Sequence, residues 1–260
     1  MLPEFDADLC IGCFQCVRAC PMGVLGKGDN QHPKTLPRRR CIECMHCAAI
    51  CPKQAVRFPG LSVEMLYQDC PEEGLESVVR KRRSVRTFQP RLPLREDIQW
   101  ALDTAEYAPS GKNIHATRWS VLWGKEITDQ ITGRVLEICE ETGEAPELPK
   151  LFRKGTNLIT CGAPCLILGW SPDDCLNPVI DTAVAMTTVE LLLQSRGLAT
   201  CWGGYLNQIA NHNPPLSRLL GVPEGSHLRC ALMVGYPKYE IYRNVPYRPE
   251  APITWVEDLN

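Results

Sequence analysis

The chain has 260 residues, of which 44% are hydrophobic and 22% are charged, and its formal net charge at pH 7 is -2. This length accommodates one ordinary domain and a smaller one, and the composition excludes a mainly disordered protein. The nearly balanced charge offers no general attraction to nucleic acid or to an anionic membrane, so we expect neither as a partner.

The first twenty residues are acidic and then rich in cysteine, and they lack the cationic start and apolar run of a secretory signal. No apolar stretch approaches the roughly 18 residues that a transmembrane helix needs. Fifteen cysteines in a chain without an export signal favour metal or redox chemistry over disulfides, because the cytosol keeps thiols reduced. We therefore expect a cytoplasmic protein.

Eight of the fifteen cysteines lie before residue 52, in two copies of one motif that stand 31 positions apart. Each copy reads CxxCxxCxxxC and ends in proline. Three thiolates at steps of three can face one cuboidal cluster, whereas the fourth, after a longer step and before a chain-breaking proline, is directed away. Paired CxxC steps also form zinc sites, but a zinc site needs neither the third cysteine nor the repeated Cys-Pro ending. The repeat thus favours iron–sulfur clusters over zinc.

This repeat resembles bacterial two-cluster ferredoxins over about residues 1 to 58. The resemblance implies two 4Fe-4S clusters in which the fourth cysteine of each motif binds the other cluster. One cluster would be held by Cys10, Cys13, Cys16 and Cys51, and the second by Cys41, Cys44, Cys47 and Cys20. Glu43 stands where the first copy has Gly12. Such differences alter the charge and hydrogen bonding that set a cluster's reduction potential.

Proline and glycine punctuation after Phe58 indicates a connection between domains. We expect a ferredoxin domain at 1–60, a linker at 61–74 and a second domain at 75–260. Within the second domain, helices are predicted over 75–83, 94–107, 125–141, 182–195 and 216–220, and strands over 116–123, 165–170 and 228–234. This mixture predicts a layered α/β or α+β architecture. The absence of Gly-x-Gly-x-x-Gly and Walker-type loops argues against a Rossmann or phosphate-hydrolysing domain.

The segment from Arg80 to Arg86 holds five positive charges and one hydroxyl, a combination that suits phosphate oxygens. Taken alone, such a run is more often a solvated helix end. Four stretches, in order and spacing, resemble the nitroreductase flavoprotein family over about residues 70 to 260. They are RRSVR at 82–86 followed by Phe88, APSGKN at 108–113, GLATCWGG at 197–204, and GVPE at 221–224 leading to GYP at 235–237.

The resemblance implies an α+β fold, a sandwich with a mainly antiparallel central sheet, and a homodimer that binds FMN at its interface. The implied FMN-binding residues fall into four groups: Arg82, Arg83, Ser84 and Arg86 for the phosphate, ribityl chain and pyrimidine edge; Pro109, Ser110, Lys112 and Asn113 in a loop from the second subunit; Gly203 and Gly204 in a turn near flavin N5; and Arg248, with Arg243 as a companion, at the phosphate. Arg86 is the expected electrostatic catalyst, because a cation near the pyrimidine edge stabilises the reduced flavin anion.

His115 follows the loop, where the chain departs from the family pattern, and it is a candidate proton donor because an imidazole can exchange a proton near neutral pH. A structural role is its alternative. Tyr107, Trp202 and Tyr205 either line the flavin pocket or belong to the core. Cys201, beside the glycine turn, is the cysteine outside the repeat to be tested for reactivity.

The presence of both modules in one chain predicts an anaerobic flavin enzyme that converts single electrons into two-electron reductions. We expect an external carrier, a ferredoxin or NAD(P)H, to supply electrons. A small organic acceptor, such as a nitroaromatic, a quinone or an activated alkene, would receive them. The alternatives are an electron-transfer subunit or a flavin redox sensor that acts on a protein partner, and a ferredoxin part that is purely structural.

Overall fold

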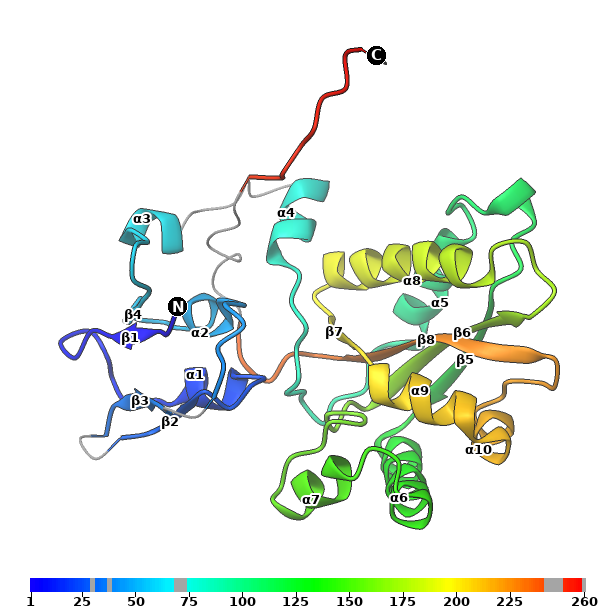
Figure 1. Cartoon of the computed structure of the whole chain (residues 1–260), viewed down its shortest axis with the longest axis horizontal. Coiled ribbons are helices and arrows are strands. Elements are labelled where there is room, and N and C mark those ends of the chain that lie inside the picture. Colours follow the sequence, from blue (N-terminus) through cyan, green and yellow to red (C-terminus); the bar gives the residue numbers. More distant parts are fainter. Residues whose placement is uncertain (29–30, 37–38, 68–73, 241–249, 259–260) are drawn as a thin grey trace. The chain divides into compact units, whose positions relative to one another are not determined.

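A computed structural model describes residues 1–28, 31–36, 39–67, 74–240 and 250–258 of the chain (Figure 1). The chain forms two compact units, one comprising Met1–Glu72 with Ile241–Asn260 and the other Glu73–Glu240. The domain limits expected from the sequence, at 60, 61–74 and 75, stay predictions. Among the helices in these described ranges, none combines the length and apolar character that crossing a bilayer requires.

The first unit is built around two short helices that repeat the cysteine motif. Helix α1 (Gln15–Ala19) and helix α2 (His46–Ala49) each follow a left-handed residue at the equivalent position of the repeat, Phe14 at φ 54° and Met45 at φ 58°. The duplicated sequence therefore produces a duplicated local backbone.

Small antiparallel sheets and a hydrophobic cluster complete this unit. Strand β1 (Glu4–Phe5) pairs with β4 (Val56–Arg57), and β2 (Leu25–Lys27) pairs with β3 (Pro33–Thr35). Helix α3 (Val63–Leu66) follows β4. The buried cluster mixes apolar side chains such as Met45, Phe58 and Leu66 with the cysteines Cys16 and Cys47. The thiols of the repeat thus lie in and around a small core.

The second unit has a four-stranded sheet in which every pair of neighbours is antiparallel. The strand order is β5 (Arg118–Trp123), β6 (Cys165–Pro172), β8 (Ser226–Gly235) and β7 (Ala199–Trp202). The helices are α4 (Leu75–Lys81), α5 (Arg95–Ala105), α6 (Lys125–Thr142), α7 (Glu147–Arg153), α8 (Pro178–Ser195), α9 (Gly204–His212) and α10 (Pro214–Leu219), with a 3-10 turn η1 at Gly111–Asn113.

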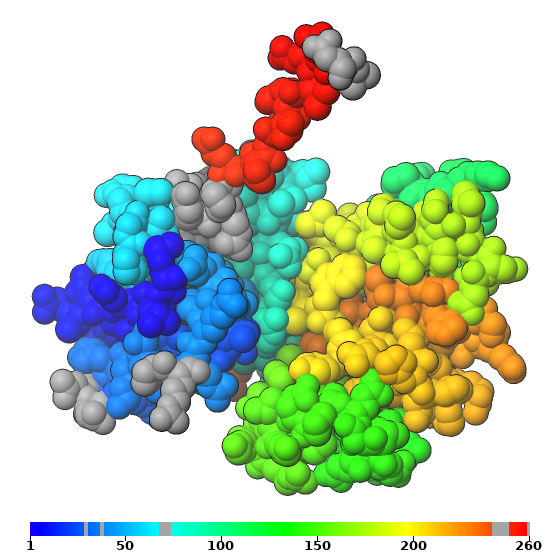
Figure 2. Space-filling model, in the orientation of Figure 1, coloured from blue at the N-terminus to red at the C-terminus, as the bar shows by residue number. Residues whose placement is uncertain are grey.

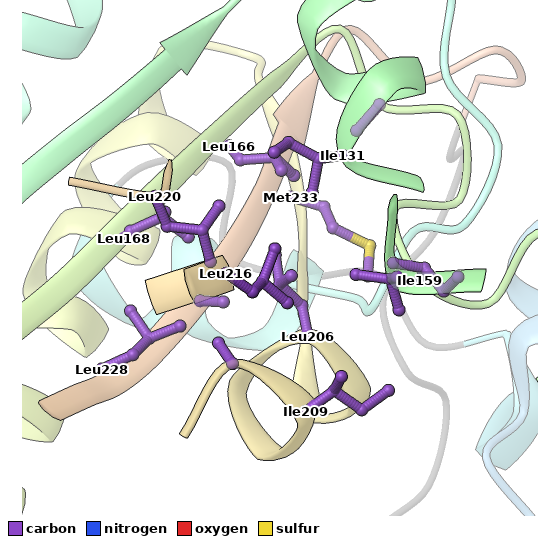
Figure 3. Packing of buried hydrophobic residues seen from close by; sticks show 14 of the residues in the cluster. Ile131, Ile159, Leu166, Leu168, Leu206, Ile209, Leu216, Leu220, Leu228 and Met233 are labelled. Atoms are coloured by element: carbon purple, nitrogen blue, oxygen red, sulfur yellow. The ribbon is translucent and has the colours of Figure 1, made fainter. Parts of the chain in front are cut away.

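Alternation along the central strands creates two cores, one on each face of the sheet. Cys165 and Ile167 of β6 pack with α5 and α8, whereas Leu166 and Leu168 pack with α6, α9 and α10. Figure 3 shows the second core, where Leu206 of α9 meets Met233 of β8. In Figure 2 the side chains of α8 and of α9 lie on either side of the orange strand β8. The unit is a three-layer sandwich around a mainly antiparallel sheet, which confirms the expected fold class.

The predicted helices and strands of this unit are all present, with ends shifted by a few residues. The largest shift is in α8, predicted from residue 182, which begins at Pro178 because proline suits the first helical position. Strand β7 and helices α7 and α9 were not predicted. A strand of four residues is too short for alternation to identify, and α9 begins directly at the Gly203-Gly204 pair, a pattern typical of a turn.

Candidate iron–sulfur and flavin sites

The two copies of the cysteine motif place left-handed residues at matching positions. Gly12 has φ 65° and its counterpart Glu43 has φ 51°. A Cβ atom at Gly12 would lie 2.6 Å from the carbonyl oxygen of Gln31, so only glycine fits there. Gly23 (φ 58°) and Gln54 (φ 51°) form another matched pair, three residues after the last cysteine of each copy. The two copies of the motif therefore share left-handed turns at matching positions.

Four thiols meet at one cavity of the first unit. Cys10, Cys13, Cys16 and Cys51 line it, together with apolar side chains that include Phe5 and Phe14. Burial raises the pKa of the Cys16 thiol to about 12, and the charges of Cys51, Cys13 and Cys10 raise it as well. Four close thiolates in an apolar cavity are stable only beside a strong positive charge, which iron supplies. The donors that the structure brings together here therefore fit a cluster.

Cysteines of the second motif lie close to cysteines of the first motif. The pKa of the Cys47 thiol is raised well above its usual value by burial first, and then by Cys44, Cys16 and Cys20. Cys20 of the first motif therefore lies near cysteines of the second motif.

Backbone N–H groups donate to the sulfurs of the fourth cysteine in each motif, the one expected to bind the cluster of the other motif. The Val24 N–H donates to Cys20 Sγ at 3.3 Å, and the Ala55 N–H donates to Cys51 Sγ at 3.2 Å. The Glu43 N–H also donates to Cys41 Sγ at 3.4 Å. Such donors stabilise thiolates and are one of the means by which a protein sets a cluster's potential.

In the second unit, the basic segment 82–86 lies along the edge strand β7. Ser84 forms a parallel β-bridge with Thr200, and the Val85 N–H donates to the Thr200 carbonyl at 2.8 Å. The segment thereby runs beside the strand that ends at Trp202, directly before Gly203. The sequence placed both stretches at one flavin site, and the structure brings them together.

The arginines of this segment differ in what they contact. Arg82 is 36% exposed at its side chain, and its Nη1 lies 3.3 Å from Glu190 Oε1. Arg83 is buried, and its Nη1 donates to the carbonyls of Arg80 and Arg82 at 2.6 and 2.7 Å. Arg86 donates to the Ser84 carbonyl at 3.1 Å, and its charge acts on the Cys201 thiol of β7. Arg82 and Arg86 thus place positive charge along β7, which suits an anionic cofactor, whereas Arg83 bonds to the carbonyls around the end of α4.

The two N–H groups of the glycine turn after β7 differ: that of Gly203 is hydrogen-bonded within the sheet, and that of Gly204 belongs to the first residue of α9. The Gly203 N–H donates to the Ala231 carbonyl at 2.8 Å. Gly204 is the first residue of α9, where backbone N–H groups have no acceptor within the helix. Gly204 is exposed, whereas Gly203 is buried. The geometry therefore favours the Gly204 N–H over that of Gly203 as a donor to the flavin ring.

The loop at 109–115 is strained and firmly held. Lys112, Asn113 and His115 all have left-handed φ values, 52°, 57° and 49°, a conformation that is costly away from glycine and common at functional sites. The His115 N–H donates to Ser110 Oγ at 3.0 Å, and His115 Nε2 lies 2.9 Å from Asn113 Oδ1. The ring of His115 is therefore part of the loop's own hydrogen bonding.

The loop is joined to helix α8 at Gly111. The Gly111 N–H lies 3.0 and 3.1 Å from the two carboxylate oxygens of Asp181. Pro109, Ser110 and His115 line a small cavity with Asp181.

The loop and the basic segment contact α8 at different points along its length. Asp181 holds the loop and Glu190 holds Arg82, and nine residues of helix separate them by about 14 Å. Figure 1 shows the segment before α5 and the segment after it toward opposite ends of α8. Within one chain, the two sets of predicted flavin residues thus form two groups rather than one.

The remaining candidates are the two late arginines and the three aromatic residues near the flavin stretches. Arg243 and Arg248 lie outside the described residues. Tyr107 is 89% exposed and is no core residue. The Trp202 indole N–H donates to Glu190 Oε2 at 3.0 Å, and the Tyr205 hydroxyl donates to Glu147 Oε1 at 2.9 Å.

Two residues with central positions were not predicted from the sequence. Asp181 and Glu190 are the only charged residues of α8, and both are buried. An isolated acid in an otherwise apolar helix is the sequence signal that would have identified them, because a buried carboxylate requires partners.

Comparison with known proteins defines the class to which this architecture belongs. Residues 79–236 match the nitroreductase family, and residues 2–52 match a 4Fe-4S dicluster domain. The chain is 27% identical over 175 residues to an iodotyrosine deiodinase of Thermotoga neapolitana, covering 63% of this chain and 88% of that protein. It is 25% identical over 202 residues to a 4-nitrobenzoate reductase of a Nocardioides species, covering 63% and 81%.

A solved structure gives the same result for the fold. A nitroreductase with bound FMN from Desulfitobacterium hafniense superposes with a TM-score of 0.59 and 26% identity, covering 70% of this chain and 98% of that one. The chain belongs to the nitroreductase family. It is a flavin oxidoreductase with an N-terminal 4Fe-4S dicluster domain, and its cofactors are FMN and two 4Fe-4S clusters.

The shared ligation of the clusters can be tested with paired cysteine variants. Cys13→Ala/Cys51→Ala removes two ligands of the same expected cluster, so iron should fall from about eight to about four atoms per chain. Cys13→Ala/Cys20→Ala removes the same number of cysteines but one ligand from each cluster, so most iron should be lost. Iron and sulfide are measured on anaerobically purified protein, with Cys175→Ala as control. Equal iron contents in the two double variants would contradict the crossed assignment.

Cys201 should be a poorly reactive thiol. Burial raises its pKa above the usual value, and the Arg86 cation opposes that shift without reversing it. Because the thiolate is the nucleophile, alkylation by iodoacetamide should be slow at pH 7 and should keep accelerating as the pH rises above about 8.5. Peptide mass spectrometry gives the rate, with the less buried Cys175 as comparison. Preferential labelling of Cys201 at pH 7 would contradict this expectation.

Proposed function

We propose that this protein takes up single electrons through its two clusters, passes them to FMN and reduces a small organic acceptor. When bound, the clusters exchange one electron at a time, and FMN can accept electrons singly and release them in pairs. The observation that carries this proposal is the presence of the eight-cysteine unit and the nitroreductase unit in one chain. A chain with this pair of units can serve a one-electron donor, which we propose to be a ferredoxin, while NAD(P)H remains a donor to be compared with it.

The names of two relatives indicate the class of acceptor. One is an iodotyrosine deiodinase and the other a 4-nitrobenzoate reductase, so both act on substituted aromatic rings. We propose a nitroaromatic, a quinone or an activated alkene as the acceptor. An iodinated tyrosine belongs in the same panel because of the first relative.

The roles of single residues are proposed from their positions. Cys10, Cys13, Cys16 and Cys51 would hold one cluster, with Cys20 joining the three cysteines of the second motif. Arg82 and Arg86 would bind the anionic parts of FMN, and Ser84 would add a neutral donor. The Gly204 N–H would approach the flavin ring. Arg86 would also stabilise the negative charge of the reduced flavin.

We propose that the loop at 109–113 reaches the flavin of a second copy. Asp181, which contacts the loop, and Glu190, which contacts Arg82, are about 14 Å apart along α8. A second subunit is therefore the simplest source of a loop for each flavin. Apolar side chains are exposed beside the loop and at the start of α8, at Tyr107, Ile114, Leu176, Val179 and Ile180. A second copy of the chain would cover them.

The electron route can be tested by comparing donors in a cluster-free variant. In Cys13→Ala/Cys44→Ala, turnover driven by reduced ferredoxin should fall close to background, because the clusters are the proposed entry point. Reduction of FMN by dithionite should be retained, since a small reductant reaches flavin directly. Product formation is followed anaerobically with each acceptor, with Cys175→Ala as the matched control. Full ferredoxin-driven turnover in the double variant would mean that the ferredoxin part is only structural.

The dimer can be tested by placing a charge on its proposed interface. Ile180 is 65% exposed, so Ile180→Glu should fold normally as a monomer but should be unable to bury that side chain against a second copy. Sedimentation equilibrium should then show a dimer for the wild type and a monomer with weakened FMN retention for the variant. Leu219→Glu on α10, where the side chain is 62% exposed, is the control. An Ile180→Glu dimer with normal FMN content would contradict the proposal.

A further inference from the structure

We infer that Glu190 is a positioning residue of the flavin site, which fixes the Arg82 guanidinium and strand β7 in the geometry that FMN binding requires. The inference rests on the proposed function of Arg82 and of the turn after β7. It adds a residue that neither touches the reacting atoms nor belongs to the four family-like stretches. Its chemistry is that of a buried acceptor shared by donors from two other parts of the chain, the basic segment and β7.

The Glu190 side chain lies in a site built to receive a carboxylate. The residue is 4% exposed, on the face of α8 directed toward β7. Its Oε1 accepts from the Thr200 hydroxyl at 2.8 Å and lies 3.3 Å from Arg82 Nη1, while Oε2 accepts from the Trp202 indole N–H at 3.0 Å. A buried carboxylate without such partners would be strongly unfavourable. These donors therefore account for its presence in an apolar helix.

The contacts couple three elements at one point. Thr200 and Trp202 are two residues apart on β7, so their side chains point to the same face of the strand. Thr200 also receives the Val85 N–H and forms the β-bridge with Ser84. Glu190 thus joins α8 to β7 by side chains, while β7 is joined to the 84–86 segment by its backbone. A displacement of Glu190 would affect the basic segment and the glycine turn together.

The consequence for FMN follows from the donor capacity of arginine. A guanidinium has five N–H donors, and the contact with Glu190 engages Nη1. An arginine already fixed in one orientation loses less conformational entropy when it binds an anion than a freely moving one. The carboxylate also reduces the net positive charge of the site, which opposes anion binding. We expect positioning to dominate, because the same carboxylate orients the indole and the strand before the turn.

The matched variants are Glu190→Gln and Asp97→Asn. In Glu190→Gln the new side-chain amide keeps one acceptor oxygen but directs an NH2 group at a neighbouring N–H donor. Asp97 is a comparably buried acid of α5 in the same unit, and it pairs with Arg196 Nη1 at 3.0 Å, away from the flavin residues. Both variants remove one carboxylate from a carboxylate–arginine pair. Only the first does so beside β7.

The experiment titrates FMN into flavin-depleted, full-length protein and measures the Kd by flavin fluorescence, alongside the melting temperature without FMN. We expect both variants to lower the melting temperature, and Glu190→Gln alone to weaken FMN binding by about tenfold or more, the loss typical of a hydrogen bond to a charged group. Thr200→Val, which removes one donor and keeps the carboxylate, should weaken binding less and should not add fully to Glu190→Gln.

Two failures are distinguishable. FMN binding by Glu190→Gln and Thr200→Val that is unchanged or tighter than in the wild type would overturn the positioning role. A wild-type protein that binds no FMN would instead overturn the flavin assignment. If Glu190→Gln does not fold, Thr200→Val decides the question, because it leaves the ion pair with Arg82 intact.

Discussion

Helix α8 carries two charged side chains, and the burial of both constrains the segments of the flavin unit that contact them. Asp181 and Glu190 lie in a helix whose other residues are mostly apolar, and each accepts hydrogen bonds from a distant part of the chain. Buried carboxylates accept few arrangements of their partners, since an unpaired one is very costly. The loop at 109–115 and the strand β7 are held in place by that requirement. The sheet and its two cores supply the rigid support to which α8 is packed.

In the first unit, backbone geometry positions the cysteines in and around a small core. A small core has little apolar surface to bury, and here the core shares its interior with cysteines. The left-handed residues recur 31 positions apart, and the buried thiols can all be deprotonated together only when bound iron offsets the repulsion among the thiolates. Folding of this unit and cluster binding are therefore expected to be coupled, as in other small metal-binding domains.

The two units are complementary in the number of electrons that their cofactors transfer at a time. The cysteine unit belongs to a class that moves single electrons, and the nitroreductase unit to a class built around FMN. The residues proposed for FMN are divided along α8 into a basic group and a loop group. A dimer that brings the loop of one chain to the basic group of another would unite them, and it would cover the exposed apolar side chains at the start of α8.

The amino-acid sequence by itself determined the cluster unit, the fold class and most of the helices and strands. Ligand spacing is a local property, so CxxCxxCxxxC-Pro indicated its chemistry without any structure. The amphipathic pattern of α6 and the long apolar run of α8, which ends before Gly197, are local properties as well. The tertiary structure alone decided which donors of the flavin segments are available. Arg83 Nη1 donates to carbonyls near the end of α4, and the Gly203 N–H donates to the Ala231 carbonyl.

Tertiary structure also selected the acids that hold the site. Nothing in the local sequence around Asp181 or Glu190 indicates that one bonds to Gly111, 70 positions away, or that the other bonds to Arg82, 108 positions away. Such partners are fixed by the packing of α8 on the sheet. The physical reason is the low dielectric of the interior, where a charge must find its partners wherever the fold has placed them in space.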